Sequence, residues 1–185
     1  MKQIDDSIWE IKELLSSSEC LSIITEAKSN GFSIAKMQHL GRNNRETLLK
    51  SSTIIQKLCV RLADEIYKEE SIAFQILCLN RILEIYQYQP GDFIVPHCDG
   101  PQEIEPSVLS SYTLVIYLND SILGGDTVFP KRGIKISPQQ GKAVLFKHSI
   151  LHESIKVLEG TKYIARTDVA ISNFNQTSKQ QNPID

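Results

Sequence analysis

The chain has 185 residues, of which 41% are hydrophobic and 23% are charged, and its formal net charge is −2. This length is sufficient for one domain with a sizeable core, and the composition is typical of neither a disordered chain nor a membrane protein. The small negative charge gives no reason to expect nucleic-acid binding, and no stretch approaches the run of about 18 apolar residues that a membrane span needs. We therefore expect neither a nucleic-acid nor a membrane partner.

The N-terminal residues 1–15 are amphipathic rather than continuously apolar, so the sequence predicts no secretory signal. Its four cysteines lie far apart, without Cys-x-x-Cys spacing, at Cys20, Cys59, Cys78 and Cys98. Such scattered cysteines are typical of reduced thiols in a cytosol rather than of a disulfide framework. We expect a cytoplasmic protein, and the sequence leaves its oligomeric state open.

Residues 1–79 are predicted to be mostly helical. Apolar residues recur at helical spacing in three segments: 4–15, from Ser18 to Gly31, and 46–68, which is the longest predicted helix. A short strand is expected at 32–37, and a polar, basic loop at 41–45. We assign these apolar stripes to the core and no chemistry to them.

After residue 79 the pattern changes to short strands. The segment 81–88 is rich in β-forming residues and ends at the turn Pro90-Gly91. Further strands are predicted at 93–96, 112–119, 126–129, 134–137, 142–147, 151–158 and 163–171. Many short strands with Gly and Pro turns favour a sandwich or barrel, and the preceding helices would cover its outer face. We expect one α+β domain over 1–172, with its β core at 81–171, and a disordered polar tail at 173–185.

The stretch Pro96-His97-Cys98-Asp99-Gly100 places a histidine and a carboxylate two residues apart. In extended chain these side chains leave from one face, so they can supply two thirds of a 2-His-1-carboxylate site for non-haem Fe(II). The alternative is an ordinary polar surface loop. His152 is the favoured second histidine, because it begins a strand that is expected to return as a hairpin carrying Lys162. His148 is the other candidate, and otherwise a surface histidine or a neighbour of the ligands.

The last predicted strand carries its charges on one face. Lys162, Ile164, Arg166 and Asp168 alternate with Tyr163, Ala165, Thr167, Val169 and Ile171. If the apolar set lies under the helices, the charged set points into the barrel, where an unpaired cation is costly. A bound dianionic acid would remove that cost, and the hydroxyl of Tyr117 could share its carboxylate. Alternatively, this face is solvated with Arg166 and Asp168 paired, and Tyr117 is a core residue.

The ordered motifs YQPGDFIVPHCDG, SSYTLVIYLND, GGDTVFP, GKAVLF, LHES and GTKYIARTDV closely resemble the Fe(II)/2-oxoglutarate-dependent dioxygenases of the prolyl 4-hydroxylase type. The resemblance covers about residues 81–171, nearly half of the chain. It implies a double-stranded β-helix (jelly-roll) barrel, and the helical N-terminal part is compatible with the helices that support that barrel.

Carried over residue by residue, the resemblance implies that His97, Asp99 and His152 bind iron. Lys162, ten residues beyond the distal histidine, would bind the C5 carboxylate of 2-oxoglutarate, with Tyr117 as its hydrogen-bonding partner. The resemblance also places Tyr88 at the co-substrate pocket and Arg166 near the other end of the co-substrate or near the substrate. It implies no catalytic residue beyond the metal ligands, O2 as the second co-substrate and ascorbate as a candidate stimulant.

The implied reaction is hydroxylation of an unactivated C–H bond with release of succinate and CO2, because halogenating relatives lack the carboxylate that Asp99 supplies. The resemblance favours a prolyl residue in a peptide or protein. Two alternatives are a hydroxylase of free amino acids or other small molecules, and a cupin-like metal-binding module without oxygenase activity. The segment 100–111 is a candidate lid, and Arg42 and Arg45 lie in a loop that could reach the site; both segments could equally be solvated loops.

Overall fold

The computed structural model describes residues 1–36, 41–68, 74–120 and 122–173. Its helices are α1 (Ser17–Asn30), α2 (Ser52–Tyr67) and a short 3-10 helix at Pro130–Arg132. The first seven strands in chain order are β1 (Lys2–Asp5), β2 (Ile8–Ile11), β3 (Ser33–Ile34), β4 (Arg45–Leu49), β5 (Phe74–Leu79), β6 (Leu83–Tyr88) and β7 (Ile94–His97). They are followed by β8 (Glu103–Glu105), β9 (Val108–Leu109), β10 (Tyr112–Tyr117), β11 (Leu123–Gly124), β12 (Thr127–Phe129), β13 (Ile134–Ile136), β14 (Ala143–Lys147), β15 (His152–Ser154), β16 (Val157–Glu159) and β17 (Lys162–Asn173).

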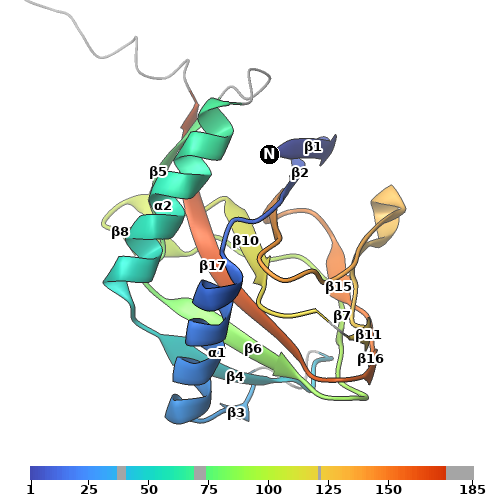
Figure 1. The fold of residues 1–185 in the computed structure, drawn as a ribbon. Coiled ribbons are helices and arrows are strands. Elements are labelled where there is room, and N and C mark those ends of the chain that lie inside the picture. The colour runs from blue at the N-terminus through green and yellow to red at the C-terminus, as the bar shows by residue number, and fades with distance from the viewer. Residues whose placement is uncertain (37–40, 69–73, 121, 174–185) are drawn as a thin grey trace, which may run out of the picture.

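Two antiparallel sheets form the body of the molecule (Figure 1). The larger runs in the order β1-β2-β14-β10-β17-β6-β4-β3, with β5 also paired to β17, and the smaller runs β13-β12-β15-β7. Apolar side chains from both sheets meet in one buried cluster, so the sheets pack face to face. This arrangement confirms the predicted α+β class and the double-stranded β-helix.

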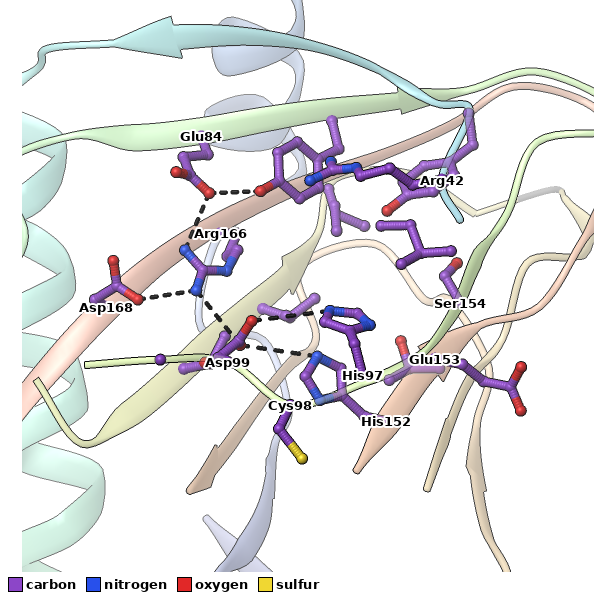
Figure 2. A pocket seen from close by; sticks show the side chains of 18 of the residues that line it. Arg42, Glu84, His97, Cys98, Asp99, His152, Glu153, Ser154, Arg166 and Asp168 are labelled. Atoms are coloured by element: carbon purple, nitrogen blue, oxygen red, sulfur yellow. Dashed lines mark hydrogen bonds and ion pairs between the residues drawn. The ribbon is translucent and has the colours of Figure 1, made fainter. Parts of the chain in front are cut away.

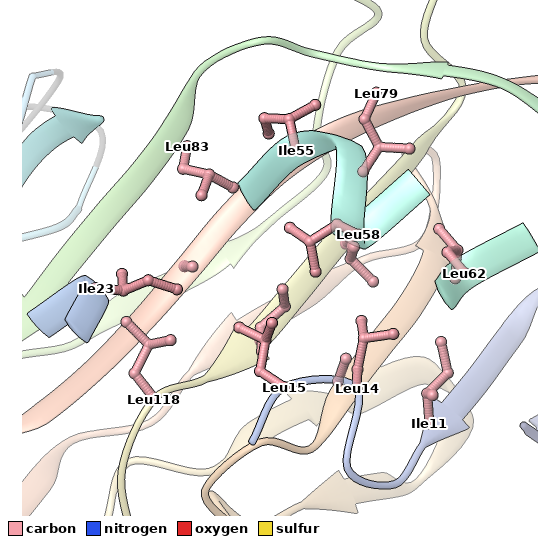
Figure 3. Close-up of a cluster of buried hydrophobic side chains, with 14 of the residues drawn as sticks. Ile11, Leu14, Leu15, Ile23, Ile55, Leu58, Leu62, Leu79, Leu83 and Leu118 are labelled. Carbon is pink, nitrogen blue, oxygen red and sulfur yellow. The ribbon is translucent and has the colours of Figure 1, made fainter. Parts of the chain in front are cut away.

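The two helices lie against the outer face of the larger sheet (Figure 1). Along β10 the alternation is strict: Leu114 and Ile116 join the helices in one cluster, whereas Val115 and Tyr117 point into the barrel. Figure 3 shows the helix side of this arrangement, where Leu58 of α2 lies among the sheet residues without solvent contact. Burying each such leucine stabilises the fold by about 1.5–3 kcal/mol, so the helices supply the second core that the barrel needs on its outer face.

Local sequence explains where α1 begins and ends. The hydroxyl of Ser16 accepts a hydrogen bond from the Glu19 backbone N–H, and the Glu19 carboxylate accepts one from the Ser16 N–H in return. This capping box satisfies two of the free N–H groups at the helix start. Gly31 follows the last turn with a φ of 77°, in the left-handed region that glycine adopts without strain. The prediction for this helix is confirmed.

Three helical predictions are corrected. Residues 4–15 hold the hairpin β1–β2 rather than a helix, because Ile8 faces the barrel interior while Trp9 and Ile11 face the helices. A strand buried on both faces mimics the spacing of a helical stripe. The predicted helix 46–68 begins only at Ser52, because residues 45–49 form the strand β4, which pairs with β6. The strand β5 also lies within residues 1–79, which were predicted to be mostly helical.

Other predicted strands differ in detail. The segment 151–158 is divided into β15 and β16, and β16 pairs with β11. β17 pairs with β10, β6 and β5 instead, so the expected hairpin carrying Lys162 is wrong. Of the predicted tail at 173–185, only Asn173 is among the described residues. Residue 37 of the predicted strand 32–37 also lies outside them. Neither helix in the described part of the chain is long and apolar enough to cross a membrane.

Candidate functional site

His97, Asp99 and His152 come together at the paired strands β7 and β15, where His97 lies opposite His152 in the register. One ligand atom from each of the three residues can be chosen so that all lie within 4.8 Å of one another. The Nδ1 atom of each imidazole faces the backbone carbonyl two residues before it, 2.9 Å from the Val95 oxygen and 3.0 Å from the Ile150 oxygen. Nδ1 therefore carries the proton and donates it, which leaves Nε2 of each ring free as a metal ligand.

The two Nε2 atoms point toward the Asp99 carboxylate, each 3.8 Å from one of its oxygens (Figure 2). Burial lowers the pKa of His152 to about 4, so its imidazole is neutral at physiological pH. Burial acts to raise the pKa of Asp99, but the positive charge of Arg166 and the hydrogen bond from the Thr113 hydroxyl act against it, and the net pKa is lowered. Two imidazole nitrogens beside a carboxylate are the donor set that suits Fe(II).

Lys162 lies deeper in the same cavity and is 1% exposed. Its ammonium donates to the Gly125 carbonyl at 2.6 Å and to the Ser154 hydroxyl at 2.7 Å, and it sits 4.7 Å from the centre of the Tyr88 ring. Burial lowers its pKa to about 7, while the more distant Asp126 acts to raise it. In the described part of the chain no carboxylate accepts a hydrogen bond from this ammonium, so its third hydrogen is available for an anionic ligand.

The two predicted tyrosines flank Lys162 in different ways. Tyr88 lies under the ammonium as a cation–π partner. The ring of Tyr117 is 5.9 Å from the ammonium, and its hydroxyl donates to Thr127 Oγ1 at 2.7 Å rather than bonding to Lys162. Burial raises the pKa of both phenols, so both act as neutral hydroxyls. Tyr117 therefore stands close to the lysine without pairing with it.

Arg166 is directed at the metal-site carboxylate. Its Nη2 atom is 3.4 Å from Asp99 Oδ2, and two other carboxylates, those of Glu84 and Asp168, each lie 3.0 Å from the guanidinium. Burial acts to lower the pKa of Arg166, but Asp99 and its other anionic neighbours raise it, so the group stays charged. Arg166 and Asp168 are paired, as in the alternative interpretation of this strand, but the pair is buried rather than solvated.

His148 lies outside the group of three candidate ligands. Its Nδ1 atom is 2.9 Å from the Thr113 hydroxyl, which in turn donates to Asp99 Oδ2. The backbone N–H of Asp99 donates to the His148 carbonyl at 3.0 Å. His148 therefore supports the site from behind Asp99, in the position of a neighbour rather than of a ligand.

One cavity of about 590 Å³ connects the three candidate ligands with Lys162. Arg42 lines it and stacks on the Tyr86 ring at 4.6 Å, whereas the exposed Arg45 lies in β4 and does not line it. Within the candidate lid 100–111, Gly100 and Gln102 line the cavity, and residues 103–109 form the β8–β9 hairpin. The thiol of Cys98 points away from the candidate ligands in Figure 2 and donates to the Ser149 carbonyl.

Comparison with known proteins assigns the chain to a family. Residues 7–182 match the family described as poxvirus C4/C10 protein, which covers almost the whole chain. The chain belongs to the poxvirus C4/C10 family.

This C4/C10 family member also has curated relatives among prolyl 4-hydroxylases. It is 37% identical over 71 residues to a probable prolyl 4-hydroxylase 11 of Arabidopsis thaliana, which covers 35% of this chain and 24% of that protein. It is 28% identical over 99 residues to the prolyl 4-hydroxylase subunit alpha-1 of Bos taurus, which covers 45% of this chain and 18% of that protein. The chain thus spans about a quarter or less of the length of these relatives. The predicted resemblance to the prolyl 4-hydroxylase type is confirmed.

Solved structures share the fold of this C4/C10 protein. The viral collagen prolyl hydroxylase of Paramecium Bursaria Chlorella virus-1, in complex with 2-oxoglutarate, has a TM-score of 0.68 at 23% identity over 89% of this chain and 95% of that one. A Trichoplax adhaerens prolyl hydroxylase in complex with a hypoxia-inducible-factor peptide fragment has a TM-score of 0.68 at 17% identity, over 89% and 83%. These likenesses establish the double-stranded β-helix.

Sequence reasoning missed several residues that complete the site. Ser154, an acceptor for Lys162, lies two residues after His152 on the same strand face, so the rule used for His97 and Asp99 could have found it. Thr113 could have been found in the same way, as an inward-facing hydroxyl four residues before Tyr117. Glu84 lies on β6, far from both ligand segments in sequence, and no local signal marks its contact with Arg166.

Proposed function

We propose that this C4/C10 family member is an Fe(II)- and 2-oxoglutarate-dependent dioxygenase that hydroxylates an unactivated C–H bond. One observation carries the proposal: three candidate ligands from two distant segments converge beside a buried ammonium group in a single cavity. A cupin-like metal module would need the ligands but would have no use for a buried lysine without a carboxylate partner, whereas an anionic ligand would offset the cost of burying its charge.

His97, Asp99 and His152 would hold the iron, and Lys162 would bind the C5 carboxylate of 2-oxoglutarate. When bound, iron and 2-oxoglutarate would supply, with O2 as the oxidant, the chemistry that hydroxylates the substrate and releases succinate and CO2. The protein's own share is positioning and exclusion of water. The Phe146 ring lies 4.5 Å from the His152 ring and holds it in place, and Tyr88 shields the anchoring ammonium from solvent.

We propose a prolyl residue in a peptide or protein as the substrate. Support comes from the prolyl 4-hydroxylases among its relatives and from the peptide-bound Trichoplax adhaerens structure among its structural neighbours. Arg42 and Gln102 are polar residues that line the cavity and would suit peptide groups. A screen for succinate release with proline-containing peptides and with free amino acids tests this choice, and turnover of free amino acids alone would assign the enzyme to small-molecule substrates.

The reaction class is tested by adding Fe(II) and 2-oxoglutarate to the protein without oxygen. We expect the weak visible charge-transfer band of the iron–2-oxoglutarate chelate. His152→Ala should abolish the band because it removes a ligand, whereas His148→Ala should keep most of it because His148 acts only through its neighbours. A wild-type protein that binds Fe(II) but gives no band would favour the cupin-like module instead.

A further inference from the structure

The strand β17 places Arg166 where it can control the orientation of Asp99. The guanidinium side chain is only 14% exposed, and it bridges Asp99 to two further carboxylates (Figure 2). Its Nη1 atom donates to Glu84 Oε2 at 3.0 Å, and its Nη2 atom lies 3.0 Å from Asp168 Oδ1 and 3.4 Å from Asp99 Oδ2. One buried cation is thus shared by three anions, one at Nη1 and two at Nη2, which restrains its position.

The surroundings of Arg166 keep its planar group in this position. The Tyr86 hydroxyl donates to Glu84 Oε2 at 2.5 Å, and the Tyr86 ring is covered by Arg42 at 4.6 Å. Glu84 is therefore itself held while it holds Arg166. A planar guanidinium with forked donors suits such bridging, whereas a lysine ammonium acts as a single point of charge.

The two oxygens of Asp99 differ in their partners. Oδ2 accepts a hydrogen bond from the Thr113 hydroxyl and faces Arg166. Among the residues that the structure describes, none donates a hydrogen bond to Oδ1, which lies 3.8 Å from His97 Nε2. Each oxygen lies 3.8 Å from one histidine Nε2, Oδ1 from that of His97 and Oδ2 from that of His152, so the difference between them is that Oδ2 alone is held by Thr113 and Arg166.

We infer that Arg166 is a positioning residue, which together with Thr113 holds Asp99 by Oδ2 so that Oδ1 faces the metal. This inference rests on the proposed function, because it presumes that Asp99 is a metal ligand. It differs from a role in anchoring 2-oxoglutarate, since the guanidinium is engaged by Asp99, Glu84 and Asp168 rather than directed at the Lys162 end of the cavity.

A positioning role and a simple charge role predict different outcomes. A cation beside a metal site repels the incoming metal, so its charge alone would weaken metal binding. Positioning would strengthen metal binding, because a carboxylate that is already oriented loses no further conformational entropy when it binds the metal. The variant Arg166→Lys separates the two roles, since it keeps the charge and loses the fork.

The test is the affinity for Mn(II), measured without 2-oxoglutarate by electron paramagnetic resonance of the free ion. We expect Arg166→Lys to bind Mn(II) about 10–100-fold more weakly than the wild type, the range typical for loss of a group that orients a metal ligand. The matched control is Arg81→Lys, whose 80% exposed side chain pairs with Glu105, and its affinity should equal that of the wild type. Equal affinities for Arg166→Lys and the wild type would overturn the inference.

A second variant keeps the test decisive if Arg166→Lys folds poorly. Thr113→Val removes the hydroxyl that donates a hydrogen bond to Oδ2 without changing charge, and it should also weaken Mn(II) binding. Because both residues hold one oxygen, the double variant should lose less than the two single losses combined. In addition, the visible spectrum of bound Co(II) should shift in both variants, which a loss of stability alone would not cause. A wild type that binds no Mn(II) would overturn the proposed function as well.

Discussion

Lys162 is an ammonium group buried by the fold beside two neutral acceptors and an aromatic ring. Its sequence position could be predicted as inward-facing, because charged and apolar residues alternate along the last strand. Its partners could not be predicted, since Gly125 and Ser154 reach it from other segments through the closure of the barrel. The same limit applies to Tyr117, whose bond to Thr127 depends on how the sheets face each other.

The first prediction concerns this ammonium. Lys162→Ala should weaken 2-oxoglutarate binding by about 10–100-fold, because a hydrogen bond to a charged group contributes about 1.5–3 kcal/mol. Metal affinity should change little, since Lys162 contacts none of the three candidate ligands. Isothermal titration of the Mn(II)-loaded protein with 2-oxoglutarate measures the first effect, with Lys147→Ala at an exposed position of β14 as the control. If Lys162→Ala binds 2-oxoglutarate normally, another residue is the anchor.

Among the elements, the barrel strands were easier to predict from the sequence than the N-terminal segment. Turn residues and alternation identify β10, β14 and β17 because each has one face toward the helices and one toward the interior. β1 and β2 could not be identified by alternation, because Ile8 and Ile11 are both fully buried, on opposite sides of the sheet. Their spacing fits a helix, and only pairing with β14 decides for a strand.

A second prediction tests the role of α2 as a cover for the larger sheet. Leu58→Ala should lower the free energy of unfolding by about 2–5 kcal/mol, because the leucine is fully buried and its removal leaves a cavity. Val60→Ala, two residues later and 61% exposed, should change it by less than about 0.5 kcal/mol. Urea denaturation compares the two variants.

Because Leu58 belongs to the cluster between helices and sheet, its loss should leave the metal affinity of the folded protein unchanged. A fall in Mn(II) affinity in folded Leu58→Ala would mean that α2 shapes the site as well as covering the sheet.

On the scale of the whole molecule, the site depends on contacts that no single segment contains. His97 and His152 meet because β7 and β15 are neighbours in the smaller sheet, while Lys162 and Arg166 are supplied by the larger one. The order of the motifs along the chain was sufficient to predict these residues as members of the site. It could not give the three-carboxylate environment of Arg166, which needs β6, β7 and β17 to be placed together. The boundary of the domain at residue 172 stays a prediction.

The burial of Lys162 should also appear in the stability of the ligand-free protein. Its pKa is lowered to about 7 in the fold from an ordinary value of 10.5, so between these pH values the unfolded chain binds a proton that the folded chain does not. Stability must then rise with pH over this window, and the full cost of burial is present below pH 7. For one proton the slope is at most about 1.4 kcal/mol per pH unit.

Lys162→Met removes this titrating group and keeps the length of the side chain. We therefore expect the unfolding free energy of the wild type to rise relative to that of Lys162→Met as the pH increases from 7 to 9, by no more than the limiting slope. Urea denaturation of both proteins at pH 6, 7, 8 and 9 measures the difference, in which other titrating groups largely cancel. Below pH 7 the difference should be constant, since the lysine is then protonated in both states. A difference that stays flat up to pH 9 would mean that the folded protein keeps Lys162 charged even without an anionic ligand.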